Sequence, residues 1–379
     1  MTIPMAWDIM KLFMNFLRGN DMRIRYYDWL EAVAIFLVCS VHAVWLKGTV
    51  AASISMSLVP MAVPVFFMVH GALLLTKEAS PQKQWKRFWK VAGQVIGWNT
   101  VYLLLSIATG LVDPSTLTLG FFYNYYIVFL DSTGITSGHL WFIYALLAVY
   151  AFFPILDACK QRSEKMLKYI WILCFIKSFV RYEVLVYGTY FGQKFFGENK
   201  IFDIEEFMRN LSPLGEYANC ILYFITGYFL SQWVQRNPKV KEQRFKYIVL
   251  AVVGFLAGLG LLLLERYIDF GQLKYNWKPL PHQYERIGAL IMASCIFVVF
   301  SLIDFKDGTL YRIARTLSLH TLDIYYIHII YARYFRLYLY EHHLAGVFQN
   351  YLRAAVILIL SFLTGQILRR IPIVKKLLT

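Results

Sequence analysis

The chain has 379 residues, of which 59% are hydrophobic and 18% aromatic, and its mean hydropathy is +0.51. With only 16% charged residues, this composition excludes an ordinary soluble protein and indicates a polytopic membrane protein. The net charge of +15 does not indicate a nucleic-acid partner, because Lys and Arg are spread over several short segments and form no stripe or binding motif.

In the N-terminal segment, residues 1–25, the residue pattern predicts an amphipathic helix over residues 3–18. Polar residues recur there at three- and four-residue spacing, opposite an apolar face; they are Asp8, Lys11, Asn15 and Arg18. We expect this helix to lie on the membrane surface. No small-residue cleavage site accompanies it, so we expect no cleavable signal peptide.

Ten further segments are apolar and have close to the ~20 residues that cross a bilayer. They are residues 29–47, 54–76, 90–111, 139–157, 167–187, 217–234, 246–264, 286–303, 318–340 and 352–368. The fifth is the least apolar, because Lys177 and Arg181 interrupt it. The sequence therefore predicts an all-α fold, a bundle of about ten transmembrane helices forming one membrane domain over residues 26–370, with a basic tail over residues 371–379.

Basic residues alternate along the connections between these segments. The N-terminus, the second, fourth, sixth and eighth connections and the tail carry most of the Lys and Arg. Because cytoplasmic segments are enriched in Lys and Arg, this pattern places both termini in the cytoplasm of a multi-pass protein in the inner (cytoplasmic) membrane. The lipid bilayer is then a partner, and a homo-oligomer is compatible with this architecture.

Two ionisable side chains, Glu31 and His42, lie in the first apolar segment. Ionisable residues are rare inside membranes and usually functional. Eleven residues separate them, which is almost three helical turns, so both lie on one face about 16 Å apart along the axis. On the predicted topology Glu31 is near the cytoplasmic end and His42 is in the outer half.

Five motifs resemble the acyltransferase-3 family, in the same order and over nearly the whole chain. They are D-W-L-x-A-x-A-I-F-x-V-x-x-x-H at 28–42, A-V-P-V-F-F-M-V-x-G at 62–71, G-H-L-W-F-I-Y-A-L-L at 138–147, L-Y-F-I-T-G-Y-F-L-S at 222–231 and L-S-L-H-T-L-D-I-Y-Y-I-H at 317–328. The resemblance implies an integral-membrane enzyme that moves an acyl group, commonly acetyl from acetyl-CoA, to a hydroxyl of a cell-envelope glycan or another exported molecule. It implies no permanently bound cofactor.

At His42 the resemblance and the chemistry agree, since a neutral imidazole can take the acceptor's proton or carry the acyl group. The alternative is a buried histidine with a structural hydrogen bond. The family usually has Arg eleven positions before this histidine, whereas this chain has Glu31. Glu31 can pair with a basic residue of another helix, mark a subfamily with altered chemistry, or mark a relative without catalysis.

Two lesser departures from the family pattern lie in the second segment. His70 stands where the family often has a small residue, and can be a second site histidine or a structural hydrogen-bonding residue. Pro60 and Met61 stand where the family tends to place Arg, which again removes a cation.

Basic residues offer candidate contacts to acyl-CoA. Lys86, Arg87 and Lys90 alternate with aromatic side chains in the second connection, a pattern that suits both CoA phosphates and lipid headgroups. Lys177 and Arg181 lie one turn apart in the fifth segment, where they can meet Glu31 or donor phosphates, or simply mark a boundary.

Further polar candidates lie in the fourth and ninth segments. His139 can assist His42 at the acceptor hydroxyl. Asp323 and His328 belong to the ninth segment, and a five-residue gap does not place them side by side on a helix. No ligand spacing argues for a metal, and the five cysteines have no CxxC spacing.

The sequence thus predicts a membrane O-acetyltransferase of polysaccharides. The rival hypothesis is a transporter or flippase of a glycan or lipid-linked precursor, whose interior polar residues line a permeation path. A scaffold that performs neither chemistry nor transport is a third hypothesis.

Overall fold

The computed structural model describes residues 23–43, 46–77, 80–123, 125–126, 138–196, 217–274, 282–339 and 346–378. These residues form helices and no strands, as predicted. The predicted amphipathic helix over residues 3–18 lies outside the described residues.

Each of the ten predicted spans overlaps a helical segment. In order these are α2 (Arg25–His42), α3 with η1 and α4 (Val50–Leu58, Val59–Met61, Ala62–Leu74), α5 (Pro81–Ala108), α7 (Trp141–Arg162), α8 with η5 and α9 (Glu164–Phe175, Ile176–Val180, Arg181–Phe196), α11 (Ala218–Arg236), α13 (Arg244–Phe270), α14 (Ile287–Leu302), α16 (Thr321–Leu339) and α17 (Val347–Leu368). Short helices include η4 (Gly138–Leu140), α12 (Pro238–Glu242), α15 (Thr309–Leu319) and α18 (Pro372–Leu378).

Five helical segments of the described chain are long and apolar enough to cross a membrane. They are Val50–Leu74, Pro81–Ala108, Gly138–Arg162, Arg244–Phe270 and Val347–Leu368, and Ile287–Leu302 is a shorter apolar helix. The total of about ten spans stays a prediction. Helices α2 and α16 are missing from the five, and each carries three charged residues.

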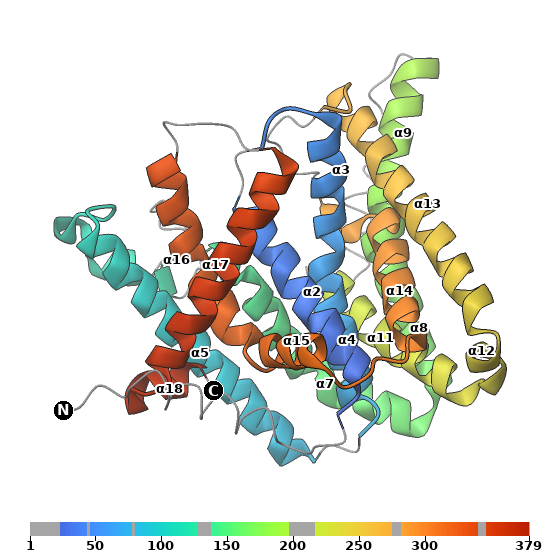
Figure 1. Cartoon of the computed structure of the whole chain (residues 1–379), viewed down its shortest axis with the longest axis horizontal. Helices are drawn as coiled ribbons and strands as arrows, with labels where there is room; N and C mark the ends of the chain where they lie inside the picture. The colour runs from blue at the N-terminus through green and yellow to red at the C-terminus, as the bar shows by residue number, and fades with distance from the viewer. Residues whose placement is uncertain are drawn as a thin grey trace.

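Helix α4 lies at the centre of the bundle, against α11 and α2 (Figure 1). Its sequence is apolar on all sides, which is typical of a helix buried all round. Glycines allow the close approach of α4 and α11: a Cβ at Gly71 would overlap the Phe224 carbonyl, and a Cβ at Gly227 would overlap the Met68 carbonyl. The peripheral α13 and α5 expose many apolar side chains, as lipid-facing helices do.

Two boundaries differ from the predictions. Helix α2 begins at Arg25 and ends at His42, so His42 lies at the carboxyl end of the helix and not within a longer one. The ninth predicted span begins at residue 318, but α15 ends at Leu319 and α16 starts at Thr321. Helix α15 is strongly amphipathic, packs against α2 and lies across the lower half of the bundle in Figure 1. The lower end holds the start of α5, where Ser80 caps the helix and Pro81 begins it.

Candidate functional site

Helix α2 carries Glu31 and His42 at opposite ends of one polar face. The last turn around His42 is held by α17, because the buried Asn350 amide donates to the Ser40 carbonyl at 3.1 Å. The carboxyl end of a helix carries partial negative charge, which favours a protonated imidazole. His42 is therefore placed where a positive charge formed during a reaction is stabilised.

Three histidines from distant parts of the chain converge around the end of α2. The ring centroids of His42 and His328 lie 5.0 Å apart, and those of His139 and His328 lie 5.7 Å apart. His328 comes from α16 and His139 from η4, just before α7. Each of the three is a separate candidate in the sequence, and the structure brings them together into what we call the histidine cluster (His42, His139 and His328).

Tyrosines surround the histidine cluster, and sequence reasoning missed them. Tyr325 lies beside both His139 and His328, and its hydroxyl donates to the His139 carbonyl. The ring centroids of Tyr102 and His139 lie 5.0 Å apart, and the Tyr102 hydroxyl donates to the Tyr326 carbonyl at 2.7 Å. A chain with 27 tyrosines gives no sequence signal that singles these out.

His328 has a fixed orientation. Its side chain is fully buried, and its Nδ1 lies 2.7 Å from the carbonyl oxygen of Tyr325, one turn earlier on α16. Its Nε2 has no hydrogen-bond partner among the described residues. In all the residues that the structure describes, no three His, Cys, Asp or Glu side chains are arranged to hold a metal ion.

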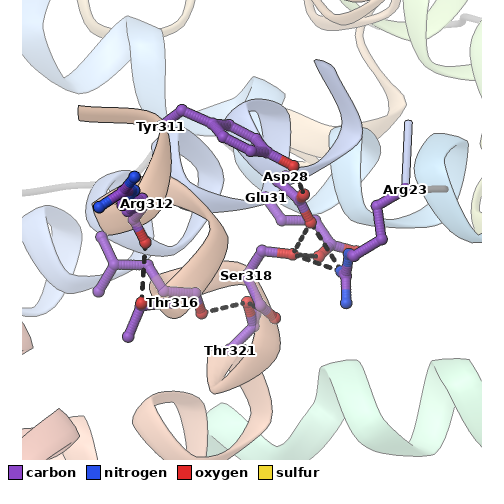
Figure 2. Close-up of polar contacts among 9 residues, drawn as sticks. Arg23, Asp28, Glu31, Tyr311, Arg312, Thr316, Ser318 and Thr321 are labelled. Atoms are coloured by element: carbon purple, nitrogen blue, oxygen red, sulfur yellow. Dashed lines mark hydrogen bonds and ion pairs between the residues drawn. The ribbon is translucent and has the colours of Figure 1, made fainter. Parts of the chain in front are cut away.

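At the other end of the α2 face, Glu31 belongs to a polar cluster with α15 (Figure 2). Asp28 is satisfied by three donors: Arg23 Nη2 at 2.7 Å, the Tyr311 hydroxyl at 3.0 Å and the Ser318 hydroxyl at 2.9 Å. The Ser318 oxygen also lies 2.5 Å from Glu31 Oε2. A hydroxyl has one hydrogen, so both Ser318 contacts can be hydrogen bonds only when a carboxyl oxygen carries a proton.

A cavity of about 520 Å³ opens beside Glu31. It is lined by Arg23, Ile24, Tyr27, Asp28, Glu31, Ala72, Leu73, Thr76, Lys77 and Gln235. Among the described residues, the contact that Glu31 makes is to Ser318, and its predicted pairing with a basic residue of another helix stays a prediction. The nearby cation is Arg23, which precedes α2 and binds Asp28. Lys77, at the end of the α4 segment, adds a second cation to the wall.

The basic residues of the second connection lie on the first turns of α5. Lys86, Arg87 and Lys90 are exposed there. The neighbouring Trp85 and Phe88 are stacked and line an apolar cavity of about 580 Å³ with Tyr150.

The remaining predicted residues have local partners. His70 Nδ1 lies 2.8 Å from the Phe66 carbonyl, one turn earlier on α4. Lys177 lies within the π-helical turn η5, and Arg181 begins α9 with its guanidinium 5.0 Å from the Tyr182 ring centre.

Asp323 lies away from His328, as the spacing predicted. Arg369 donates two hydrogen bonds to the Asp323 carboxylate, at 2.6 and 3.1 Å, and His320 lies 2.9 Å from it. Asp323 therefore joins α16 to the end of α17. Arg369 was missed because it follows the last apolar segment and reads there as a topology signal.

Comparison with protein families agrees with the resemblance seen in the motifs. A family model described as an acyltransferase domain, that of acyltransferase-3, matches residues 24–370. Neither the comparison with curated proteins nor the comparison with solved structures gives a match. The matched range contains the histidine cluster, the Glu31 cavity and Arg369.

Proposed function

The chain belongs to the acyltransferase-3 family and is a membrane acyltransferase; from this premise we propose that it is an O-acetyltransferase that moves an acetyl group from acetyl-CoA to a hydroxyl of an exported or cell-envelope glycan. The observation that carries this proposal is the histidine cluster at the carboxyl end of α2, with imidazole centroids 5.0 and 5.7 Å apart. Grouped imidazoles supply the proton transfers or the nucleophile that acyl transfer to a hydroxyl needs.

His42 is the proposed base or acyl carrier. It is half-buried, whereas His139 and His328 are buried, so it is the most accessible imidazole of the three. Taking a proton from a hydroxyl leaves His42 positively charged, and the partial negative charge at the end of α2 stabilises that state. His139 is proposed to lie on the acceptor side of the same reaction.

The donor is proposed to approach from the cytoplasmic side. Arg23 and Lys77 line the 520 Å³ cavity, and Lys86, Arg87 and Lys90 lie on nearby α5. Guanidinium and ammonium groups suit the phosphates of CoA. Glu31 does not suit them, and Asp28 with Ser318 holds it in a polar cluster instead, so Arg23 is the proposed cation of this cavity.

The acceptor is proposed to approach from the opposite side. Aromatic side chains gather there around α6 (Leu119–Tyr123) and the residues that follow it: Phe121, Phe122, Tyr123, Tyr125 and Tyr126. Sugars stack their apolar faces on such rings. This side also bears His139, which supports an acceptor path that ends at the histidine cluster.

The test is transfer of isotope-labelled acetyl from acetyl-CoA to envelope glycans by membranes that contain the full-length protein. We expect His42→Ala to lower transfer by ~10²-fold or more, which is the range of general acid–base contributions. His282→Ala is the control, because His282 is exposed and lies outside the histidine cluster, where it contacts Glu285 and stacks on the Tyr182 ring.

Glu31→Arg, measured beside these variants, reports whether a guanidinium at that position raises transfer. Transfer by Glu31→Arg with none by the wild type would identify a relative without catalysis. Well-folded protein that transfers neither acetyl nor longer acyl groups in any variant would overturn the proposal and favour a transporter of glycans or lipid-linked precursors.

A further inference from the structure

The protonation of His328 follows from its partner on α16. A carbonyl oxygen only accepts hydrogen bonds, so Nδ1, 2.7 Å from the Tyr325 carbonyl, is the ring nitrogen that carries the hydrogen. Nε2 then presents a lone pair. This lone pair is buried and has no partner among the described residues, which is unusual for a polar atom inside a protein.

The ring of His42 is the nearest imidazole to this lone pair. The two centroids lie 5.0 Å apart with the planes inclined by 53°. A hydrogen bond between two ring nitrogens spans about 3 Å, and each nitrogen lies about 1 Å from the centre of its ring. A centroid distance of 5.0 Å is therefore close to that of two hydrogen-bonded imidazoles. A small rotation of His42, which is half-buried and lies at the end of its helix, can therefore form the bond.

His139 is less suited to this role. Its centroid lies 5.7 Å from His328, with the rings nearly perpendicular. Its position is fixed by Tyr325, which donates to its carbonyl, and by Tyr102, whose ring lies against it. Of the two imidazoles beside His328, His42 is thus the better placed to donate to it, and the α16 helix holds His328 in the tautomer that accepts.

We propose that His328 is a positioning residue that accepts the N–H of His42 and thereby holds the lone pair of the other His42 nitrogen toward the acceptor hydroxyl. This inference rests on the proposed function and takes the base role for His42. When His42 removes the hydroxyl proton, its first proton moves toward His328 Nε2, so the two rings share one positive charge.

The reaction balances without another reactant. The acceptor O–H bond breaks as its oxygen forms a bond to the acyl carbon of the thioester, and the C–S bond breaks. The histidine pair then transfers the proton that it took from the hydroxyl to the thiolate of CoA. His328 itself touches neither the acyl group nor the acceptor.

The test compares His328→Ala with His328→Gln in the full-length protein, using the labelled-acetyl assay. We expect His328→Ala to lower kcat by 10²-fold or more while KM for acetyl-CoA changes less than twofold. His328→Gln should retain more activity than His328→Ala, because its carbonyl oxygen still accepts a hydrogen bond but does not take the proton. His282→Gln serves as the matched control.

Rescue separates this role from a purely structural one. Imidazole added to His328→Ala should restore part of kcat, whereas pyrrole at the same concentration should not, because it fills the same space without an acceptor nitrogen. Equal effects of the two molecules, or wild-type kcat in His328→Ala, would overturn the pairing while the proposed function stands. Absence of transfer by the wild type would overturn both.

A chemical readout needs no activity. Diethyl pyrocarbonate acylates the lone-pair nitrogen of imidazole, and mass spectrometry measures its rate at His42. We expect this rate to fall in His328→Ala relative to wild type, because the hydrogen bond that His42 donates to His328 no longer raises the nucleophilicity of the lone-pair nitrogen of His42. An unchanged rate in folded protein would contradict the pairing.

Discussion

Glu31 and Ser318 lie 2.5 Å apart although 287 positions separate them in the chain. The contact joins the amino-terminal half of α2 to α15, and the same Ser318 oxygen lies 2.9 Å from Asp28 (Figure 2). In the part of the chain that the structure describes, the Glu31 carboxyl group thus contacts a hydroxyl on a short amphipathic helix, and no ion pair to it is seen. This arrangement keeps Glu31 in the wall of the cavity.

Ser318→Ala should destabilise the protein by about 1–2 kcal/mol, because it removes the hydroxyl that contacts both Asp28 and Glu31, and Asp28 is almost fully buried. The free energy of unfolding in detergent measures this loss. The double variant that combines Ser318→Ala with Glu31→Gln should show a coupling energy of ~0.5 kcal/mol or more between the two changes. Thr321→Ala, whose hydroxyl bonds only to backbone carbonyls of α15, is the control. Strict additivity of Ser318→Ala and Glu31→Gln would contradict the contact.

Arg369→Gln should lower the free energy of unfolding by about 3–5 kcal/mol, more than Ser318→Ala does. It removes the partner that donates two hydrogen bonds to the Asp323 carboxylate, which is 1% exposed. The loss appears as a lower thermal midpoint in detergent. Arg370→Gln changes the adjacent, exposed arginine and should have little effect. Adding Asp323→Asn should recover much of the stability lost in Arg369→Gln, since the uncompensated charge disappears. Failure of that recovery would assign the loss to another contact of Arg369.

The helices could be predicted from the sequence, since apolar segments of about 20 residues leave few alternatives in a membrane. The common face of Glu31 and His42 also followed from helical spacing alone. The convergence of His42, His139 and His328 could not be predicted, because ring distances between helices depend on how their side chains pack.

Contacts of α15 were missed for a related reason. Ser318 and Tyr311 lie in a segment that hydropathy divides between a connection and a span, so its amphipathic helix was not recognised. Arg23 was counted only as a topology charge, whereas the structure shows it bound to Asp28 at the cavity. Lys and Arg near the ends of apolar segments can either fix the topology or take part in a site, and the residue type is the same in both cases.

Gly227→Ala should strongly destabilise the bundle, because the new methyl group would overlap the Met68 carbonyl where α11 crosses α4. Neither backbone can withdraw without opening the core. Gly260→Ala is the matched control, since it lies in α13 with nothing within 4 Å of the added atom. It should be neutral or stabilise by about 0.5–1 kcal/mol. Similar thermal midpoints for the two variants would show that α4 and α11 do not approach this closely.

Glu164 and Arg236 form an ion pair outside the predicted spans, with N···O distances of 2.8 and 3.1 Å. Hydrogen bonds from Arg236 hold the pKa of the Glu164 carboxyl below its ordinary value of 4.5. A lowered pKa in the folded state stabilises the protein above the unfolded value, and this stability is lost as pH falls through the folded value. The gain is less than about 1 kcal/mol because the pair is exposed. The thermal midpoint of wild type should exceed that of Glu164→Gln at pH 7. The difference should shrink below pH 4.5 and vanish once the pH lies below the lowered pKa of Glu164 in the folded protein. A difference that persists in acid would exclude ionisation of Glu164 as its cause.

Arg23→Gln should raise KM for acetyl-CoA by about 5–10-fold and change kcat little. The reason is that Arg23 supplies a guanidinium to the cavity wall and precedes the amino-terminal end of α2, whereas His42 lies at the carboxyl end. Arg23→Lys keeps the charge and the bond to Asp28, so its KM should lie between wild type and Arg23→Gln. Arg25→Gln is the control, because Arg25 bonds to the Phe305 carbonyl at the exposed end of α2. Equal KM values for Arg23→Gln and Arg25→Gln would remove Arg23 from the donor site. A loss of kcat at unchanged KM would place Arg23 in the chemical step instead.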